Sequence, residues 1–250
     1  PELTKNTIDK KCTLTTRHFA LPTSYLHAGE NRFEVVFAGS TRQYGVNIEA
    51  KSVWLKKSLI IMLPALFLLL CAKACGFTRH TWRNPANALA CILIGLGVYT
   101  LTSSYSALSQ TYDEAFHIAS GMQWWDWGAY TFELMHPPLA RIAASALLYA
   151  SDITPQGDYT GLTARIGNRM LHTGGDYIGN LTLARLGILP FYLLAGAVVF
   201  LWSRQLFGEK AALLSLLLYV FSPMVAAHSA LATTDMPYAA LCVCALYACV

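Results

Sequence analysis

Four long apolar runs decide what this chain can fold into. They cover residues 58–75, 86–108, 181–206 and 211–227, and a further run starts at Met236. Each of the four is close to the roughly 20 residues that a helix needs to cross the hydrocarbon layer of a bilayer. Because 55% of all residues are hydrophobic and only 13% are charged, we predict a mainly α, polytopic membrane helical bundle. Its partners include membrane lipids, and no basic patch suggests a nucleic acid.

Two regions differ in pattern and are predicted as separate domains. Residues 1–55 alternate apolar and polar side chains with period two between turn-rich segments, which predicts a β-rich piece. Two interpretations stay open for it: part of a jelly-roll-like sugar-binding module, or the end of a β-sandwich without a ligand. Residues 56–250 form the membrane domain, with a long outer loop at about 110–180. Because the chain opens without methionine and stops inside an apolar run, we expect a piece of a longer protein.

Basic residues predict how the bundle is oriented. The connection after the first run contains Arg79 and Arg83, and Lys73 lies at the end of that run, so the positive-inside rule assigns the connection to the cytoplasm. Lys56 and Lys57, before that run, oppose the assignment. With the connection inside, the β-rich piece and the loop after the second run lie on the extracytoplasmic side.

That outer loop contains charged and imidazole side chains in the segment YDEAFHIASGMQWWDWGAYTFELMHPPL. Ionisable residues at a membrane edge are functional candidates by default, and here they are Asp113, Glu114, His117 and His136. The alternatives are ordinary: a helix cap or solvated acid at Asp113, and an exposed helical pair of Glu114 and His117. Asp113 and His117 also have the i, i+4 spacing of metal ligands. We expect helices over residues 114–127 and 137–150, with His136 extended before the second.

Four further candidates come from the helix that follows this segment, from the run at 181–206 and from the connection after the run at 211–227: Arg141, Arg185, His228 and Asp235. Arg141 and Arg185 are either site residues or arginines that snorkel to the headgroups. Asp235 is either a site residue or the cap of the helix that starts at Met236. The predicted topology brings His228 and Asp235 to the same membrane face as Asp113.

Three segments together resemble a known family. They are YDEAFH, HPPLAR and the long segment from NLTLARLGILPF to HSALATTD, and they are similar to the amino-terminal half of the membrane domain of glycosyltransferase family 39. This family contains the protein O-mannosyltransferase-like and aminoarabinose-transferase-like enzymes of the glycosyltransferase-C superfamily. The resemblance covers about residues 86–250. Many bacterial relatives have Glu directly before the His of HPPL, where this chain has Met135, with Glu133 three residues before His136.

The resemblance implies an enzyme that transfers a sugar, a hexosyl or pentosyl group, from a polyprenyl-phosphate carrier on the extracytoplasmic side. The family's Asp-Glu motif falls on Asp113 and Glu114, its His-Pro-Pro-Leu element on residues 136–139, and a further acid on Asp235. It also implies an integral protein of the bacterial inner (plasma) membrane that acts in glycosylation at the cell envelope. The acceptor is a protein, a lipid or a glycan.

The chemistry asks for the same residue types. An acceptor hydroxyl needs a base to remove its proton, and Asp113 is the candidate. The carrier phosphate leaves as an anion that Arg185, or else Arg141, would stabilise. One base without a nucleophilic carboxylate predicts inversion.

Other residues are given binding roles. Glu114 would orient the acceptor, while His136 or Asp235 would hold hydroxyl groups. No metal site is assigned, although a divalent ion between His117, His136 and an acid is left open.

Two rival functions remain. One is a transporter or flippase of a lipid-linked sugar, which predicts paired broken helices. The other is a non-catalytic glycan-binding membrane subunit.

Overall fold

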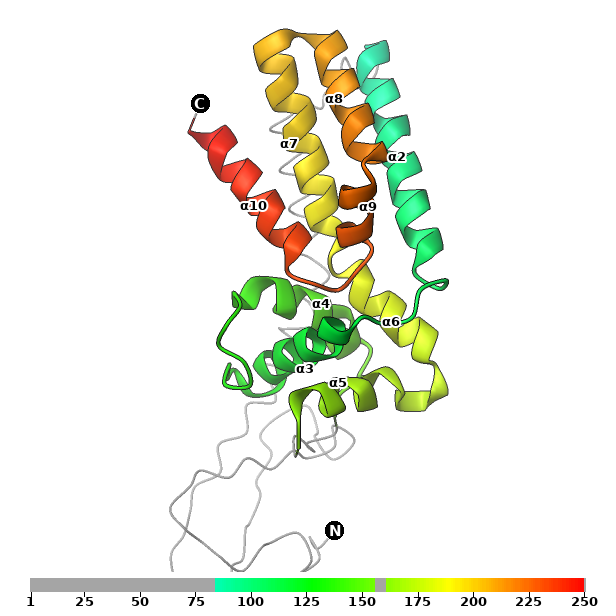
Figure 1. The fold of residues 1–250 in the computed structure, drawn as a ribbon, viewed down its shortest axis with the longest axis vertical. Helices are drawn as coiled ribbons and strands as arrows, with labels where there is room; N and C mark the ends of the chain where they lie inside the picture. Colours follow the sequence, from blue (N-terminus) through cyan, green and yellow to red (C-terminus); the bar gives the residue numbers. More distant parts are fainter. Residues whose placement is uncertain (1–83, 156–160, 250) are drawn as a thin grey trace, which may run out of the picture.

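A computed structural model describes residues 84–155 and 161–249, and over these ranges the chain is helical without any strand. Figure 1 shows long helices gathered at one end and a layer of shorter helices at the other. The helices are α2 (Pro85–Ser104), α3 (Tyr112–Trp127), α4 (Pro138–Ala150), α5 (Thr163–Leu171), the 3₁₀ turn η4 (Thr173–Gly175), α6 (Tyr177–Leu186), α7 (Leu189–Phe207), α8 (Glu209–Phe221), α9 (Pro223–Ser229) and α10 (Asp235–Ala248). The β-rich piece, the run at 58–75 and the basic connection after it lie outside the described residues.

The long helices confirm the predicted membrane bundle. Two segments are long and apolar enough to cross a bilayer, α2 and the combined length of α6 and α7 from Tyr177 to Phe207. Helices α8 and α9 count as a third when taken together, but they are bent by 59° where Ser222 is followed by Pro223. The Ser222 side chain caps the new helix by accepting a hydrogen bond from Val225 N at 3.5 Å. The run predicted as a single span is therefore a broken one.

The layer of shorter helices is packed closely around α3. Gly121 of α3 lies against the Arg141 carbonyl of α4, and Gly167 of α5 lies against the Ala115 carbonyl, so that a Cβ at either glycine would overlap backbone atoms. Fully buried side chains fill the space between the three helices: Ile118, Met122, Leu148, Ile166 and Met170. This spacing brings the polar side chains of α3 and α4 within hydrogen-bond distance of each other.

The two helices predicted in the outer loop are present with nearly the expected ends. Helix α3 ends at Trp127 and is followed by Gly128, whose positive φ of 65° suits glycine. Helix α4 has Pro138 in its first turn, as expected, and His136 lies outside it. Helix α5 was not predicted.

Candidate active site

Asp113 is an exposed carboxylate in the first turn of α3. Its place is determined by a capping box, in which Glu114 Oε2 accepts a hydrogen bond from Thr111 N at 2.7 Å. The N-cap is therefore Thr111, and Asp113 itself caps nothing. Among the residues that the structure describes, Asp113 has no hydrogen-bond partner, so its carboxylate is available to a ligand.

Glu114, next to Asp113, is part of a fully buried ion pair with Arg185 of α6. The guanidinium binds the carboxylate through two bonds, Nε to Oε1 at 2.9 Å and Nη2 to Oε2 at 3.0 Å, and both side chains are 0% exposed. The remaining three N–H groups of Arg185 donate to the carbonyls of Tyr105, Leu108 and Ser109, at 2.9, 2.9 and 3.1 Å. All five donors of this arginine are thus occupied, which offsets the cost of burying its charge.

The same carboxylate also joins the segment before α10 to α3. Glu114 Oε1 accepts a hydrogen bond from Ala232 N at 2.8 Å. Three residues later, exposed Asp235 lies 3.2 Å from His228 Nδ1 and accepts a hydrogen bond from Thr233 Oγ1 at 3.1 Å. Two regions far apart in the sequence, one with Asp113 and the other with Asp235, therefore meet at one end of the bundle.

Arg141 of α4 is the centre of a second polar cluster, and it is also 0% exposed. Its Nε donates to His117 Nδ1 at 3.1 Å, and its Nη1 donates to Tyr130 Oη at 2.8 Å and to the Glu133 carbonyl at 3.0 Å. Its Nη2 donates to Glu133 Oε2 and lies 2.8 Å from His136 Nδ1. Four of its five N–H groups therefore have an acceptor, and the fifth has one only in the tautomer of His136 whose Nδ1 is unprotonated.

The two histidines of this cluster differ in exposure. His117 is 5% exposed, whereas the side chain of His136 is 44% exposed, and their rings meet edge to face at 5.5 Å. His136 Nδ1 lies 2.8 Å from Glu133 Oε1 as well as 2.8 Å from the arginine. The structure thus brings Glu133, three residues earlier in the chain, back to His136 in place of an acid directly before it.

The cluster lowers the pKa values of two of its groups, both outside the membrane-spanning helices. Burial, followed by the nearby charges of Arg141 and His136, lowers the pKa of His117 to about 4. Burial alone would raise the pKa of Glu133, but hydrogen bonds from Arg141 and His136 and their charges lower it below its ordinary value. At neutral pH His117 is uncharged and Glu133 is ionised.

The predicted site residues thus fall into bonded groups, with Asp113 exposed beside them. Glu114 pairs with Arg185, His228 pairs with Asp235, and His117 and His136 both contact Arg141. Sequence reasoning missed the roles of Tyr130 and Glu133, although the spacing of Glu133 and His136 was visible. Within the described ranges, no group of three or more His, Cys, Asp or Glu side chains is arranged to hold a metal ion.

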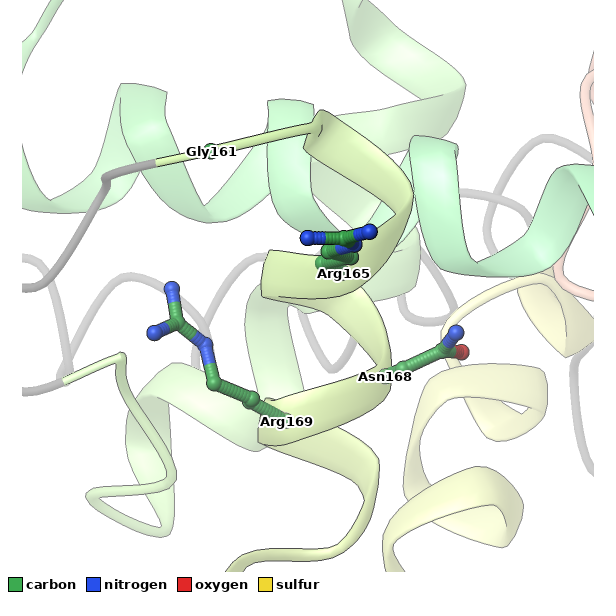
Figure 2. A pocket seen from close by; sticks show the side chains of 4 residues that line it. All are labelled: Gly161, Arg165, Asn168 and Arg169. Atoms are coloured by element: carbon green, nitrogen blue, oxygen red, sulfur yellow. The ribbon is translucent and has the colours of Figure 1, made fainter.

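A hollow of about 470 Å³ lies on α5, and none of the predicted residues lines it. Figure 2 shows its lining side chains, of which Arg165 and Arg169 are exposed. Asn168, also in the lining, accepts a hydrogen bond from Gln110 Nε2 at 2.5 Å. This surface is basic and is built from a helix that packs on α3.

The fold and the site together define a class: an integral membrane protein of apolar helices with an exposed carboxylate held at their ends. Residues 179–250, from α6 through α10, match the family described as dolichyl-phosphate-mannose-protein mannosyltransferase. The match supports the resemblance over residues 179–250, whereas the YDEAFH and HPPLAR segments lie outside the matched range. Over that range the chain is similar to membrane glycosyltransferases of the mannosyltransferase type. No curated protein matches the chain, and no solved structure does either.

Proposed function

We propose that this protein transfers a sugar from a polyprenyl-phosphate carrier to an acceptor hydroxyl, with inversion, and that Asp113 is the general base. The observation that carries the proposal is the state of Asp113, which is exposed and unbonded among the described residues while the adjacent Glu114 is locked in a buried ion pair. A base needs both properties, since it must be free to take a proton and must be held in one place.

The reaction balances with one proton acceptor. The hydroxyl oxygen forms a bond to the anomeric carbon, its proton passes to Asp113, and the bond from that carbon to the phosphate oxygen breaks. The carrier phosphate leaves as an anion, so that no general acid is required. Because no second carboxylate acts as a nucleophile, a single displacement inverts the anomeric centre.

The two buried arginines are given a positioning role in this proposal. Arg185 fixes the first turn of α3, and Arg141 fixes His117 and the segment before α4. Arg185 has no N–H left for the carrier phosphate while its present bonds persist, and Arg141 has at most the one that faces His136 Nδ1. Stabilisation of the leaving phosphate is therefore not assigned to Arg185, in contrast to the expectation from the sequence. His136, His228 and Asp235 are exposed enough to bind hydroxyl groups of the donor or acceptor.

We also propose that the site faces the extracytoplasmic side, as the positive-inside rule suggests, and that the membrane is a bacterial inner membrane, as the family resemblance implies. One assay distinguishes protein, lipid and glycan acceptors and also tests for a dependence on a divalent ion. Membranes containing the protein are incubated with radiolabelled polyprenyl-phosphate mannose, with and without EDTA, and label in the protein, lipid and glycan fractions is counted.

The decisive variant is Asp113→Asn. It removes the base and should lower transfer by about 10²–10⁴-fold. The matched control is Asp152→Asn, because Asp152 is another exposed acid of the same layer and its φ of 59° is one that asparagine tolerates. Full transfer by Asp113→Asn would refute the proposal. Movement of label across the membrane without transfer would favour a flippase, and binding of glycan alone would favour a non-catalytic subunit.

A further inference from the structure

The hollow on α5 is a feature that the proposed function does not use. Its volume is about 470 Å³, and none of the candidate site residues lines it. Two of its four lining residues are the exposed arginines Arg165 and Arg169, which are four positions apart and therefore lie on successive turns of one helix face (Figure 2). Guanidinium groups are always charged and only donate hydrogen bonds, so this face suits a ligand that is negatively charged.

The charge of Arg165 is not neutralised within the described part of the chain. The helix segment TARIGNRML contains no Asp or Glu, and Arg165 has no hydrogen-bond or ion-pair partner among the residues that the structure describes. The first acid after α5, Asp176, caps α6 by accepting a hydrogen bond from Gly179 N at 2.9 Å. Glu114, on the helix against which α5 packs, is buried in its pair with Arg185. The guanidinium of Arg165 is therefore left for a ligand.

The backbone that presents the two arginines is fixed by packing. Ile166 and Met170, on the buried face of α5, are 0% exposed, and Gly167 lies against the backbone of the first turn of α3. Asn168 accepts a hydrogen bond from Gln110, directly before the N-cap of α3. A site on a fixed helix costs less conformational entropy when a ligand binds than a site on a loop does.

We propose that Arg165 and Arg169 bind a phosphate group in this hollow, carried by a membrane phospholipid or by a water-soluble phosphate ester. A carboxylate is planar and presents both oxygens to one guanidinium, whereas a phosphate is tetrahedral and presents oxygens in several directions, so that two guanidiniums can bind it at once. The volume falls within the range of about 300–1,000 Å³ that is usual for small-molecule sites, which leaves room for the group esterified to the phosphate.

Both sources of phosphate reach this place. Helix α5 belongs to the layer of short helices at one end of the apolar bundle (Figure 1), where lipid headgroups meet water. The inference goes beyond the proposed function and does not depend on it.

Binding is measured on protein solubilised in a maltoside detergent, without sugar donor or acceptor. Equilibrium dialysis with radiolabelled glycerol 3-phosphate, a soluble ester that is also the headgroup unit shared by phospholipids, should show saturable binding. Arg165→Gln combined with Arg169→Gln should weaken it by about tenfold or more, because charge-assisted hydrogen bonds are lost. The matched control is Arg204→Gln combined with Lys210→Gln, which removes two positive charges at the junction of α7 and α8, at the other end of the long helices (Figure 1). The control should leave the affinity unchanged.

Three results would overturn the inference: no saturable binding, equal weakening in the variant pair and the control pair, or equally tight binding of glycerate, which has a carboxylate in place of the phosphate ester. If the double variant fails to fold, Arg165→Gln alone gives the answer. Its exposed side chain has no partner in the described ranges, so the variant should keep the Tm of the unaltered protein and weaken binding several-fold.

A competition experiment identifies the source of the phosphate. Phosphatidylglycerol, or diacylglycerol as the matched lipid without a phosphate, is added to the micelles during dialysis. Displacement of glycerol 3-phosphate by phosphatidylglycerol alone would assign the hollow to a phospholipid, and displacement by neither would assign it to a soluble ester. Displacement by both lipids would mean that acyl chains, and no phosphate, occupy the hollow, and would refute the inference.

Discussion

The buried pair of Glu114 and Arg185 predicts a large loss of stability when one partner is removed. Glu114→Ala leaves a guanidinium that is 0% exposed without its carboxylate. It also leaves two backbone N–H groups, those of Thr111 and Ala232, without their acceptor. Breaking a buried ion pair from one side typically costs about 3–5 kcal/mol, because the remaining charge stays buried.

For a chain of this size, that cost corresponds to a fall in Tm of roughly 6–20 °C. The measurement is thermal unfolding of the detergent-solubilised protein, followed by the fluorescence of its tryptophans. The control is Glu209→Ala, which removes an acid 2.8 Å from Arg204 in a pair whose side chains are 45% and 35% exposed. An exposed pair of this kind contributes about 1 kcal/mol or less, so the control should shift Tm by only a few degrees.

A double variant tests the reasoning itself. Glu114→Ala combined with Arg185→Ala removes the buried unpaired charge, so its cost should be smaller than the sum of the two single costs. If the single costs add, or if Glu114→Ala behaves like the Glu209→Ala control, the pair does not hold α3 to α6 in the way argued above.

The remaining predictions concern packing and pH. Gly167→Ala places a methyl group into the Ala115 carbonyl and should destabilise the protein by about 1–3 kcal/mol, measured as a fall in Tm; an unchanged Tm would mean that α5 is not packed this closely on α3. Because the pKa of His117 is lowered to about 4, the unfolded chain binds a proton there at higher pH than the folded protein does. The contribution of the uncharged His117 to the free energy of unfolding is therefore fully present above pH 6.5 and is lost as the pH falls toward 4. At pH 5 the loss is about 2 kcal/mol. His117→Asn should flatten this slope between pH 7 and pH 5, and an unchanged slope would contradict the assignment.

The elements that were predicted well are those with strong local signals. Helix α4 begins with Pro138 and could be located from its first residues. Helix α3 was expected from residue 114, and the Thr-x-x-Glu capping box that starts it at Tyr112 was missed. Helix α5 has only nine residues and a glycine at its centre, so its local helix signal is weak. Its apolar face is buried only because it packs against α3. The bend before Pro223 was hidden because the apolar run continues through it.

Site residues could be selected from the sequence, but their pairing could not. Residue type and topology were enough to choose Asp113, Glu114 and Arg185 as candidates. No local sequence signal indicates that Arg185 pairs with Glu114. The two residues are 71 positions apart in the chain, and their contact depends on how α6 packs. The same holds for Arg141, because its contacts with Tyr130, Glu133 and His136 form only once residues 130–136 fold back over α4.

The hydrogen bond from Ala232 N to Glu114, which attaches the segment before α10 to α3, has a consequence for sequence divergence. Its donor is a backbone N–H group, which every residue type except proline supplies. Evolution can therefore exchange the side chain at this position for another small one, with the attachment intact. A single change of codon to proline would sever it.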